Sequence, residues 1–340
     1  MVEPNAQPAE FIDITKYQLR SKIASGGMGS IYRAYQLGPE GFKKEVALKM
    51  ILSEYSGNSE FLRLFIGEAK LVADLVHENI VQVYHLGQLK DQYFIAMEYV
   101  DGIDLQEFMN WHIEQKVALD PDLGAFIISR ICRALEYAHD KSDRHGNQLN
   151  IVHRDVSPRN IMANFQGVVK LADFGIAKAR MLMEQQEGSV VMGKEAYMSP
   201  EQARFEETDR RSDLFSLGVV MYELLTGKRL FLDSDFQNSF FSAKTPQIPA
   251  PRSLRGDLPE GLAGILKQAL QRDLSSRYQT AGKMGYDLEY YMYHDRFGPT
   301  NVTLGEYVRE HFQKGPPPKE GSMTPEPLRT TVRLTNYHKL

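Results

Sequence analysis

The sequence predicts an α+β fold of two lobes, a small lobe rich in β-strands followed by a larger lobe that is mainly helical. Between residues 17 and 99, short runs alternate apolar and polar side chains, which is typical of half-buried strands. Beyond Gly102 the apolar residues recur at helical spacing instead. This change of period places the joint between the lobes near residues 98–102.

The small lobe is predicted to contain five short strands and one helix. The helix, Glu60–Val76, has apolar residues three and four positions apart. The predicted strands are Tyr17–Arg20, Ser30–Ala34, Val46–Lys49, Val81–Tyr84 and Tyr93–Met97.

Four helices are predicted in the larger lobe, three of them from the spacing of apolar residues. The fourth is predicted from Thr303-Leu304-Gly305-Glu306, in which the first hydroxyl and the last carboxylate can each cap a backbone N–H group. We therefore expect the last helix to begin at Thr303. The other three are Leu123–His139, Asp213–Leu225 and Leu262–Leu270.

Composition and charge exclude several classes of protein. The chain of 340 residues is 42% hydrophobic and 25% charged, as is ordinary for a globular protein. Its 40 basic and 44 acidic residues give a net charge of -4, so no overall basic field favours nucleic acid or an anionic membrane. The single cysteine, Cys132, cannot form an intramolecular disulfide, and the most apolar run, Leu214–Leu225, is too short to span a bilayer. These features predict a soluble, cytoplasmic protein and do not indicate an oligomeric state.

The two ends of the chain differ from the rest in composition. Residues 1–10 are acidic and contain prolines, without the apolar run of a secretory signal, and they are predicted to be disordered. After Phe312 the chain contains the run Gly315-Pro316-Pro317-Pro318 and almost no large apolar residue before Leu328. This composition favours a solvated linker or a docking segment over a packed element.

A cluster of glycines lies between the first two predicted strands. Residues 23–31 read Ile-Ala-Ser-Gly-Gly-Met-Gly-Ser-Ile. Glycine lets backbone N–H groups approach phosphate oxygens because it has no Cβ. A dinucleotide-binding turn would be followed by a helix, whereas residues 31–34 resume the alternation of a strand. The cluster therefore predicts a hairpin, a feature that is common and by itself indicates no function.

Lys49 ends an apolar predicted strand. A lysine in this position usually extends into solvent. It becomes a candidate phosphate ligand where a carboxylate can hold it, and Glu68 on the predicted helix is available for that role.

Two later segments place carboxylate and amide side chains on loops. Asp155 and Asn160 lie in residues 151–161, and Asp173 follows an apolar strand in residues 169–175. Oxygen ligands of this kind suit Mg²⁺, which binds through one or two carboxylates together with phosphates and water. The tendency of Asp and Asn to form turns explains either loop alone. It does not explain both loops in this order after Lys49.

With these motifs in order, the chain resembles the eukaryotic-like (Hanks-type) protein kinases and is most similar to their bacterial Ser/Thr branch. The resemblance extends from Tyr17 to Arg277. It implies a protein kinase domain over residues 11–312, with a small lobe at 11–98, a hinge at 98–102 and a larger lobe at 103–312. Residues 313–340 would then form a flexible, proline-rich tail.

The resemblance also implies ATP and Mg²⁺ as cofactors and a protein as the substrate. Asp155 would accept the proton of the substrate hydroxyl, and Lys49, held by Glu68, would contact the phosphates. Asn160 and Asp173 would bind Mg²⁺. The residues implied in nucleotide binding are Ile23, Ala24, Ser25, Gly26, Gly27, Met28, Gly29, Ser30, Ile31, Ala47, Lys49, Glu98, Val100 and Met162.

The resemblance further implies two structural roles and one regulatory site in the larger lobe. Glu201 is expected to pair with Arg277, and Asp213 is expected to brace the catalytic loop. Ser189 is the expected phosphorylation site, because Arg154 before the catalytic aspartate is typical of kinases that respond to such a phosphate.

Three positions depart from the family pattern. The first glycine of the loop is replaced by Ala24. The lysine usual two residues after the catalytic aspartate is Ser157, and the threonine usual before the Tyr-Met-x-Pro-Glu run is Lys194. We hypothesise that Lys194 supplies the missing charge beside Asp155, or that Arg159 does so, as in tyrosine kinases. A tyrosine or dual-specificity kinase therefore stays an alternative to a Ser/Thr kinase, and so does a nucleotide-binding pseudokinase that acts as a scaffold.

Overall fold

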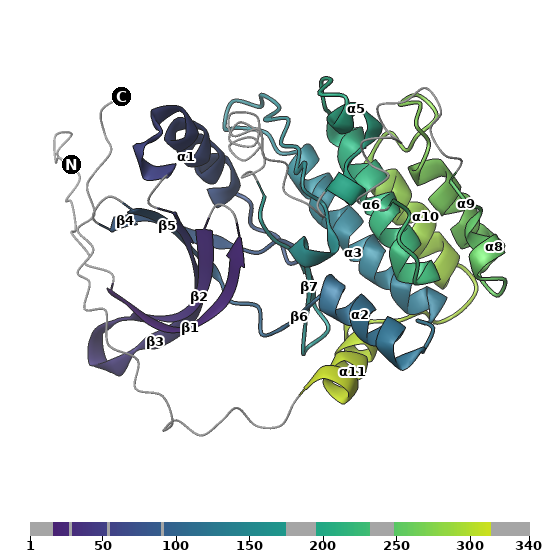
Figure 1. Ribbon diagram of the computed structural model, residues 1–340, viewed down its shortest axis with the longest axis horizontal. Coiled ribbons are helices and arrows are strands. Elements are labelled where there is room, and N and C mark those ends of the chain that lie inside the picture. Colours follow the sequence, from purple (N-terminus) through teal and green to yellow (C-terminus); the bar gives the residue numbers. More distant parts are fainter. Residues whose placement is uncertain are drawn as a thin grey trace, which may run out of the picture. The chain divides into compact units, whose positions relative to one another are not determined.

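The computed structural model describes residues 16–26, 29–52, 55–89, 92–174, 195–231 and 248–313 (Figure 1). The chain divides into two compact units, and the boundary in the middle of the chain falls between Tyr99 and Val100. Among the described residues, the first unit holds those of 16–62 and 83–99, and the second holds those of 63–82 and 100–313.

The first unit is built on a five-stranded antiparallel sheet with the strand order β1-β2-β3-β5-β4. The sheet confirms the predicted α+β class and the position of the strands, with one correction. Val81 and Gln82 lie outside the fourth strand, because the N–H of Val81 donates to the carbonyl of Leu171 in the second unit. The strands are β1 Lys16–Gly26, β2 Gly29–Leu37, β3 Lys43–Ile51, β4 Val83–Leu89 and β5 Gln92–Glu98.

Alternation along β3 gives the sheet one apolar face. Val46 and Leu48 are buried in a cluster with Ala34 of β2 and with Phe94 and Ala96 of β5. Successive side chains of a strand point to opposite faces. Residues 47 and 49 therefore lie on the other face.

The glycine cluster forms the predicted hairpin. Gly26 of β1 pairs with Gly29 of β2, and no helix follows. Gly29 is required for the approach of β2 to β3, since a Cβ there would lie 2.1 Å from the carbonyl oxygen of Met50. Gly27 and Met28, at the tip, lie outside the described residues.

Helix α1, Ser59–Ala73, begins one residue before its predicted start and ends three residues before its predicted end. The side chain of Asn58 accepts a hydrogen bond from the N–H of Phe61, which caps the first turn. The boundary between the two units falls within this helix, after Leu62.

The second unit is mainly helical, and helices α3 and α6 lie at its centre (Figure 1). Helix α6 is buried at every position from Ser212 to Leu225, as expected for a helix surrounded by other elements. The helices are α2 Leu105–Gln115, α3 Pro121–His139, α5 Pro200–Ala203, α6 Arg210–Thr226, α8 Pro251–Leu254, α9 Glu260–Ala269, α10 Ala281–Tyr293 and α11 Asn301–Phe312.

A three-stranded antiparallel sheet and four short 3-10 helices complete the described structure. The sheet has the order β6-β7-β8. Its strands are β6 Gly102–Asp104, β7 Ile161–Asn164 and β8 Val169–Leu171. The 3-10 helices are η1 Pro39–Gly41, η2 Tyr55–Gly57, η3 Pro158–Asn160 and η4 Glu195–Tyr197. No helix of the described ranges is long and apolar enough to cross a membrane.

Helix α10 packs along α3 by means of a close backbone approach. A Cβ on Gly285 would lie 3.0 Å from the Cβ of Cys132, so the two helices meet at this position. Leu288 and Met292, on the same helix, are fully buried. Cys132 is buried as well, which fits a packing role.

The predicted start of the last helix is wrong by two residues. Helix α11 begins at Asn301, and its N-cap is Thr300, whose side chain accepts from the N–H of Thr303. The hydroxyl of Thr303 closes the capping box by accepting from the N–H of Thr300, so Thr303 takes the third helical position instead of the cap. Pro299 fixes the chain just before this cap.

Helix α11 is closely packed against the turn between β7 and β8. Gly167 in this turn has φ +81, and a Cβ there would lie 1.8 Å from the carbonyl oxygen of Asn301. A Cβ on Gly305 would lie 2.7 Å from the carbonyl carbon of Gln166. A larger side chain at either glycine would have to displace backbone. The close approach of α11 to this turn therefore requires glycine at both positions.

Candidate active site

The loop that carries Asp155 is held at its beginning by Asp213 of α6. The carboxylate of Asp213 accepts hydrogen bonds of 2.8 Å from the N–H of His153, at Oδ2, and from the N–H of Arg154, at Oδ1. Its Oδ2 also lies 2.8 Å from Nε2 of His139. A single buried carboxylate thus fixes two consecutive peptide groups just before Asp155.

The pKa of Asp213 shows that its carboxylate is stabilised in the charged form. Burial alone would raise this pKa, but the hydrogen bonds from Nε2 of His139 and from the backbone N–H of His153 lower it below its ordinary value. The brace is therefore ionised at neutral pH.

Asp155 is held by Asn160. Nδ2 of Asn160 donates to the carbonyl of Asp155 at 2.7 Å and to its Oδ2 at 3.0 Å. Both partners are acceptors, so the amide can have only one orientation. Oδ1 of Asn160 then remains as an oxygen ligand for a cation.

His153 links the loop that carries Asp155 to the segment before Asp173. Its Nδ1 accepts from the N–H of Asp155 at 3.2 Å, so Nε2 carries the proton and donates to the carbonyl of Ala172 at 2.9 Å. The N–H of Ala172 in turn donates to the carbonyl of Asn160 at 2.8 Å. Two hydrogen bonds around Ala172 therefore tie the two loops together one residue before Asp173.

The backbone at Asp173 has an unusual conformation. Its φ is 61, in the left-handed region that residues other than glycine rarely adopt. The next residue, Phe174, is buried, with its ring centroid 4.5 Å from that of His153 in an edge-on contact. This packing holds the bend at Asp173.

The donor atoms of this site fit a magnesium ion. Asn160 offers an amide oxygen and Asp173 a carboxylate, both oxygen ligands, which Mg²⁺ prefers. The described residues contain no group of three or more His, Cys, Asp and Glu that could hold a metal. In proteins Mg²⁺ commonly completes its coordination with substrate phosphates and water.

In the first unit, Lys49 lies on the sheet face opposite the apolar cluster. It pairs in register with Ile31 of β2 and Ile95 of β5, so these side chains share its face. Ala47, two residues earlier, shares it as well. Glu68 lies on α1, but its side chain is outside the described part of the structure.

The other residues predicted to bind nucleotide fall into two groups. Val100 and Met162 belong to the second unit, whereas the rest that the structure describes belong to the first. Val100 is buried, and Met162 on β7 is half-buried and pairs with Asp104 of β6. Those of the first unit are Ile23, Ala24, Ser25 and Gly26 at the end of β1, Gly29, Ser30 and Ile31 in β2, Ala47 and Lys49 in β3, and Glu98 at the end of β5.

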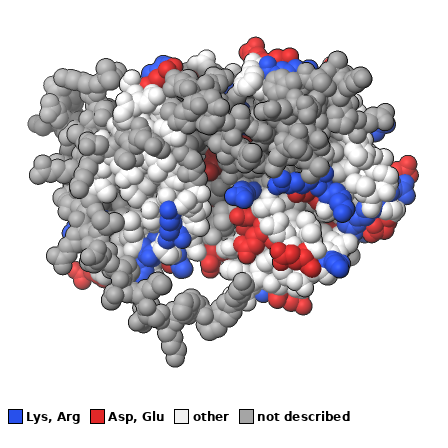
Figure 2. Space-filling model, viewed as in Figure 1, with Lys and Arg blue, Asp and Glu red and all other residues white. Residues whose placement is uncertain are grey.

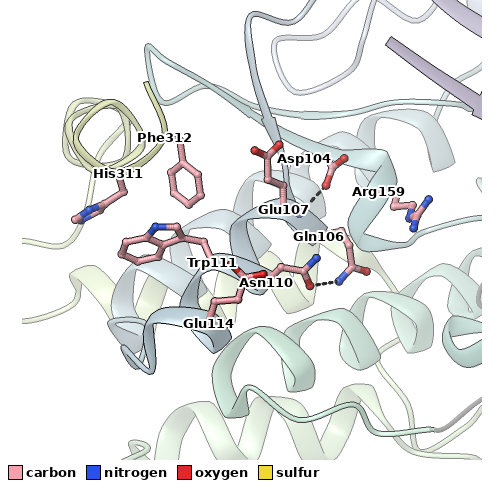
Figure 3. Close-up of a pocket in the computed structure, with 9 residues that line it drawn as sticks. All are labelled: Asp104, Gln106, Glu107, Asn110, Trp111, Glu114, Arg159, His311 and Phe312. Carbon is pink, nitrogen blue, oxygen red and sulfur yellow. Dashed lines mark hydrogen bonds between the residues drawn. The ribbon is translucent and has the colours of Figure 1, made fainter. Parts of the chain in front are cut away.

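Of the three residues in the charge hypothesis, the structure describes Ser157 and Arg159. Ser157 is buried, and its Oγ has no hydrogen-bond partner. Arg159, in η3, is exposed and lines a pocket with residues of α2 and α11 (Figure 3). Lys194 and Ser189 lie outside the described residues, so the proposed contact between Lys194 and Asp155 stays a prediction.

Gln202 is a residue of the site that the sequence analysis missed. Its Nε2 donates to the carbonyl of Arg154 at 2.9 Å, and its Oε1 accepts from the N–H of Ser199 in a capping box that begins α5. The pattern Ser-Pro-Glu-Gln at residues 199–202 has the spacing of a capping box and would have predicted this turn. One glutamine thus connects the start of α5 to the catalytic loop.

The segment before α6 is held by two buried polar pairs. Arg277 donates to Glu201, as expected from the resemblance, with Nη1 2.8 Å from Oε1. The hydroxyl of Tyr197 donates to Oε2 of Glu223 at 2.5 Å. Burial raises the pKa of Glu223, and the hydrogen bond from Tyr197 only partly offsets this rise.

Comparisons with known proteins identify the family of this chain. The family model of the protein kinase domain matches residues 17–285. The chain is 38% identical over 296 residues to the tyrosine-protein kinase MasK of Myxococcus xanthus, covering 87% of this chain and 46% of that protein. It is 33% identical over 293 residues to the serine/threonine-protein kinase PrkC of Bacillus subtilis, covering 86% of this chain and 43% of that protein.

A solved structure also has the same fold. The crystal structure of the PknI kinase domain of Mycobacterium tuberculosis has a TM-score of 0.62 and 25% sequence identity, and the match covers 83% of this chain and 99% of that one. This chain spans less than half of the length of MasK and of PrkC. The family match over residues 17–285, together with these relatives, shows that the chain belongs to the protein kinase family.

Proposed function

We propose that this chain transfers the γ-phosphoryl group of Mg-ATP to a serine or threonine hydroxyl of a protein, in the cytoplasm. The observation that carries the proposal is the arrangement around Asp155, whose carboxylate and carbonyl both accept from Asn160 on a loop braced by Asp213. Phosphoryl transfer requires mainly positioning and charge neutralisation, and this loop provides the positioning.

Each residue has a separate task in this proposal. Asp155 orients the substrate hydroxyl and accepts its proton as the oxygen attacks phosphorus. Asn160 and Asp173 would hold Mg²⁺, which supplies neutralisation of the phosphate charge when bound. Lys49 would contact the phosphates from the sheet of the first unit.

The preference for serine and threonine rests on the relatives. PrkC and the PknB protein of Mycolicibacterium smegmatis are both named serine/threonine-protein kinases, whereas MasK is named a tyrosine-protein kinase. Arg159 occupies a position that carries arginine in tyrosine kinases, and it therefore favours tyrosine as the acceptor residue. Tyrosine or dual specificity is therefore the competing candidate.

The test compares wild type with Asp155→Asn in an assay with labelled ATP, Mg²⁺ and a general protein substrate. Wild type should transfer phosphate, Asp155→Asn should not, and hydrolysis of the product should yield phosphoserine and phosphothreonine. Asp295→Asn, which changes an exposed aspartate beyond α10, is the matched control and should retain activity. Phosphotyrosine as the main product would overturn the Ser/Thr assignment, and ATP binding without any transfer would support the scaffold alternative.

A further inference from the structure

A pocket of about 420 Å³ opens between α2, the turn η3 of the catalytic loop and the last residues of α11 (Figure 3). The indole of Trp111 forms its floor, with the ring centroid of His311 at 4.6 Å and that of Phe312 at 5.4 Å. Arg159 lies on the side away from the two α11 residues. The pocket thus combines an aromatic floor with a position beside the catalytic loop.

The wall formed by α11 is firmly attached to the second unit. Apart from the contact at Gly167 and Gly305, the ring of Tyr307 stacks on His112 of α2 with an interplanar angle of 2°, and the two residues are hydrogen-bonded at 3.2 Å. Helix α11 also lies beyond residues 17–285, which the kinase family model matches.

The pocket has an excess of negative charge. Asp104, Glu107 and Glu114 line it, against one arginine, Arg159. Within the described ranges, none of these four side chains forms an ion pair. Acidic side chains gather over the face that α2 occupies (Figure 2). A half-buried tryptophan that shares its pocket with carboxylates free of ion pairs suits a lysine or arginine side chain, which can stack on the ring and pair with the carboxylates.

The chain itself carries a basic segment, which follows the pocket residue Phe312 in the sequence after a spacer. Phe312 lines the pocket, and residues 314–327 follow with five prolines and with two lysines against two glutamates. Residues 328–340 then contain Arg329, Arg333 and Lys339 and no acidic residue. A neutral, proline-rich spacer thus joins a basic segment to the rim of an acidic pocket.

We propose that residues 328–340 dock in this pocket of their own chain, with a basic side chain over Trp111 and between Glu107 and Glu114. The spacer makes the docking intramolecular, and short linkers give effective concentrations in the millimolar range, so weak charge pairs suffice to fill the site. The proposal concerns binding and does not depend on the proposed catalytic activity.

Trp111 is the only tryptophan of the chain, so its fluorescence reports directly on the pocket. In the full chain, acrylamide should quench this emission weakly at about 0.1 M salt and more strongly at about 1 M salt. The reason is that the screening length falls from about 10 Å to about 3 Å, which weakens the charge pairs. The double variant Arg329→Glu/Arg333→Glu should show the strong quenching already at low salt. Arg252→Glu/Lys267→Glu, which reverses two exposed charges elsewhere, is the matched control and should behave as wild type.

Two further experiments test whether the tail and the pocket carboxylates contact each other. Glu107→Gln/Glu114→Gln should reproduce the tail variant, and a peptide of residues 328–340 added to the tail variant should restore protection of Trp111. Quenching of the tail variant equal to that of wild type at low salt would overturn the proposal. Protection that is lost on dilution of the wild-type protein would overturn docking within one chain and show docking between two copies.

Discussion

Arg277 and Glu201 form a fully buried ion pair, in which both nitrogen atoms Nη1 and Nη2 donate to the carboxylate, at 2.8 and 3.2 Å. The hydroxyl of Ser212 donates to the same carboxylate at 2.7 Å. Burial alone would raise the pKa of Glu201, but its hydrogen bond and charge interaction with Arg277 lower it below the ordinary value. The pair joins α5 to the segment before α10.

We expect Glu201→Gln to lower the free energy of unfolding by about 3–5 kcal/mol, because it leaves a buried guanidinium without its counter-charge. Urea denaturation measures this loss. Glu206→Gln, a change of an exposed residue a few positions later, is the matched control and should leave stability nearly unchanged. Equal stability of Glu201→Gln and wild type would show that the pair does not contribute.

The same substitution should change the pH dependence of stability. A depressed folded-state pKa means that the contribution of Glu201 is present above its unfolded pKa, near 4.5, and is lost as the pH falls through the folded value. The difference in stability between wild type and Glu201→Gln should therefore shrink below pH 4.5. A difference that stays constant on acidification would assign the loss to packing instead of charge.

Asp213→Asn should lower both kcat and stability. The carboxylate accepts from His153 and Arg154 at different oxygen atoms, and an amide would offer its N–H group to one of these donors. The unmade hydrogen bond should cost about 1–3 kcal/mol in urea denaturation. The loop bearing Asp155 would lose its brace, so kcat should fall more than the KM for ATP changes. Unchanged kcat in a folded variant would separate the brace from catalysis.

Lys49→Met is expected to abolish phosphoryl transfer without unfolding the protein. Lys49 lies on the sheet face opposite the buried cluster, so its loss removes charge and little packing. Phosphate incorporation and the melting temperature measure the two effects. Lys22→Met, at an exposed position of β1, is the control and should retain turnover. Transfer by Lys49→Met at the wild-type rate would remove Lys49 from the site.

Asp173→Ala should eliminate the stabilisation of the protein by Mg-ATP while leaving that by metal-free ATP largely in place. Ligand binding stabilises the folded state by an amount that grows with the ratio of ligand concentration to Kd, so thermal shifts with and without Mg²⁺ at one ATP concentration measure the metal-dependent part. Asn160→Ala should have a similar but smaller effect because it removes a neutral ligand. Equal shifts of Asp173→Ala and wild type in Mg-ATP would contradict the metal assignment.

Lys194→Ala and Arg159→Ala distinguish the two candidates for the missing cation. Loss of a charge that stabilises the transition state typically lowers kcat by about 10²-fold or more, with little change of the KM for ATP. We expect this result for Lys194→Ala. Arg159 is exposed at the pocket of α2 and α11, so Arg159→Ala should lower kcat much less than Lys194→Ala does. The reverse outcome would assign the charge to Arg159.

Local patterns predicted the elements that form clear apolar or alternating runs, and failed where packing decides. The strand Val46–Lys49 was visible as a short apolar run, because Val46, Ala47 and Leu48 are all buried. Helix α10 was missed because Gly282 and Gly285 weaken its helical pattern, although Gly285 is needed for the contact with Cys132. Helix α2 has a weaker apolar face, and its burial depends on α11.

The candidate site shows the same division. The types and order of Asp155, Asn160 and Asp173 could be found in the sequence. The hydrogen bond from Gln202 to Arg154 and the pocket at Trp111 could not, because each joins segments that are far apart in the chain. Sequence patterns predict local structure, whereas these contacts depend on the tertiary packing of distant segments.

The position of α10 has a practical consequence for anyone who wishes to shorten this protein. A chain ended at residue 285, where the family match stops, would keep only the first five residues of α10. It would lose Leu288 and Met292, each fully buried and worth about 1.5–3 kcal/mol of burial, and Glu289, which pairs with Arg130. The face of α3 that they cover would become an aggregation-prone surface. The smallest piece of this chain that expresses well should therefore extend past the family boundary, through α10 and on to the end of α11.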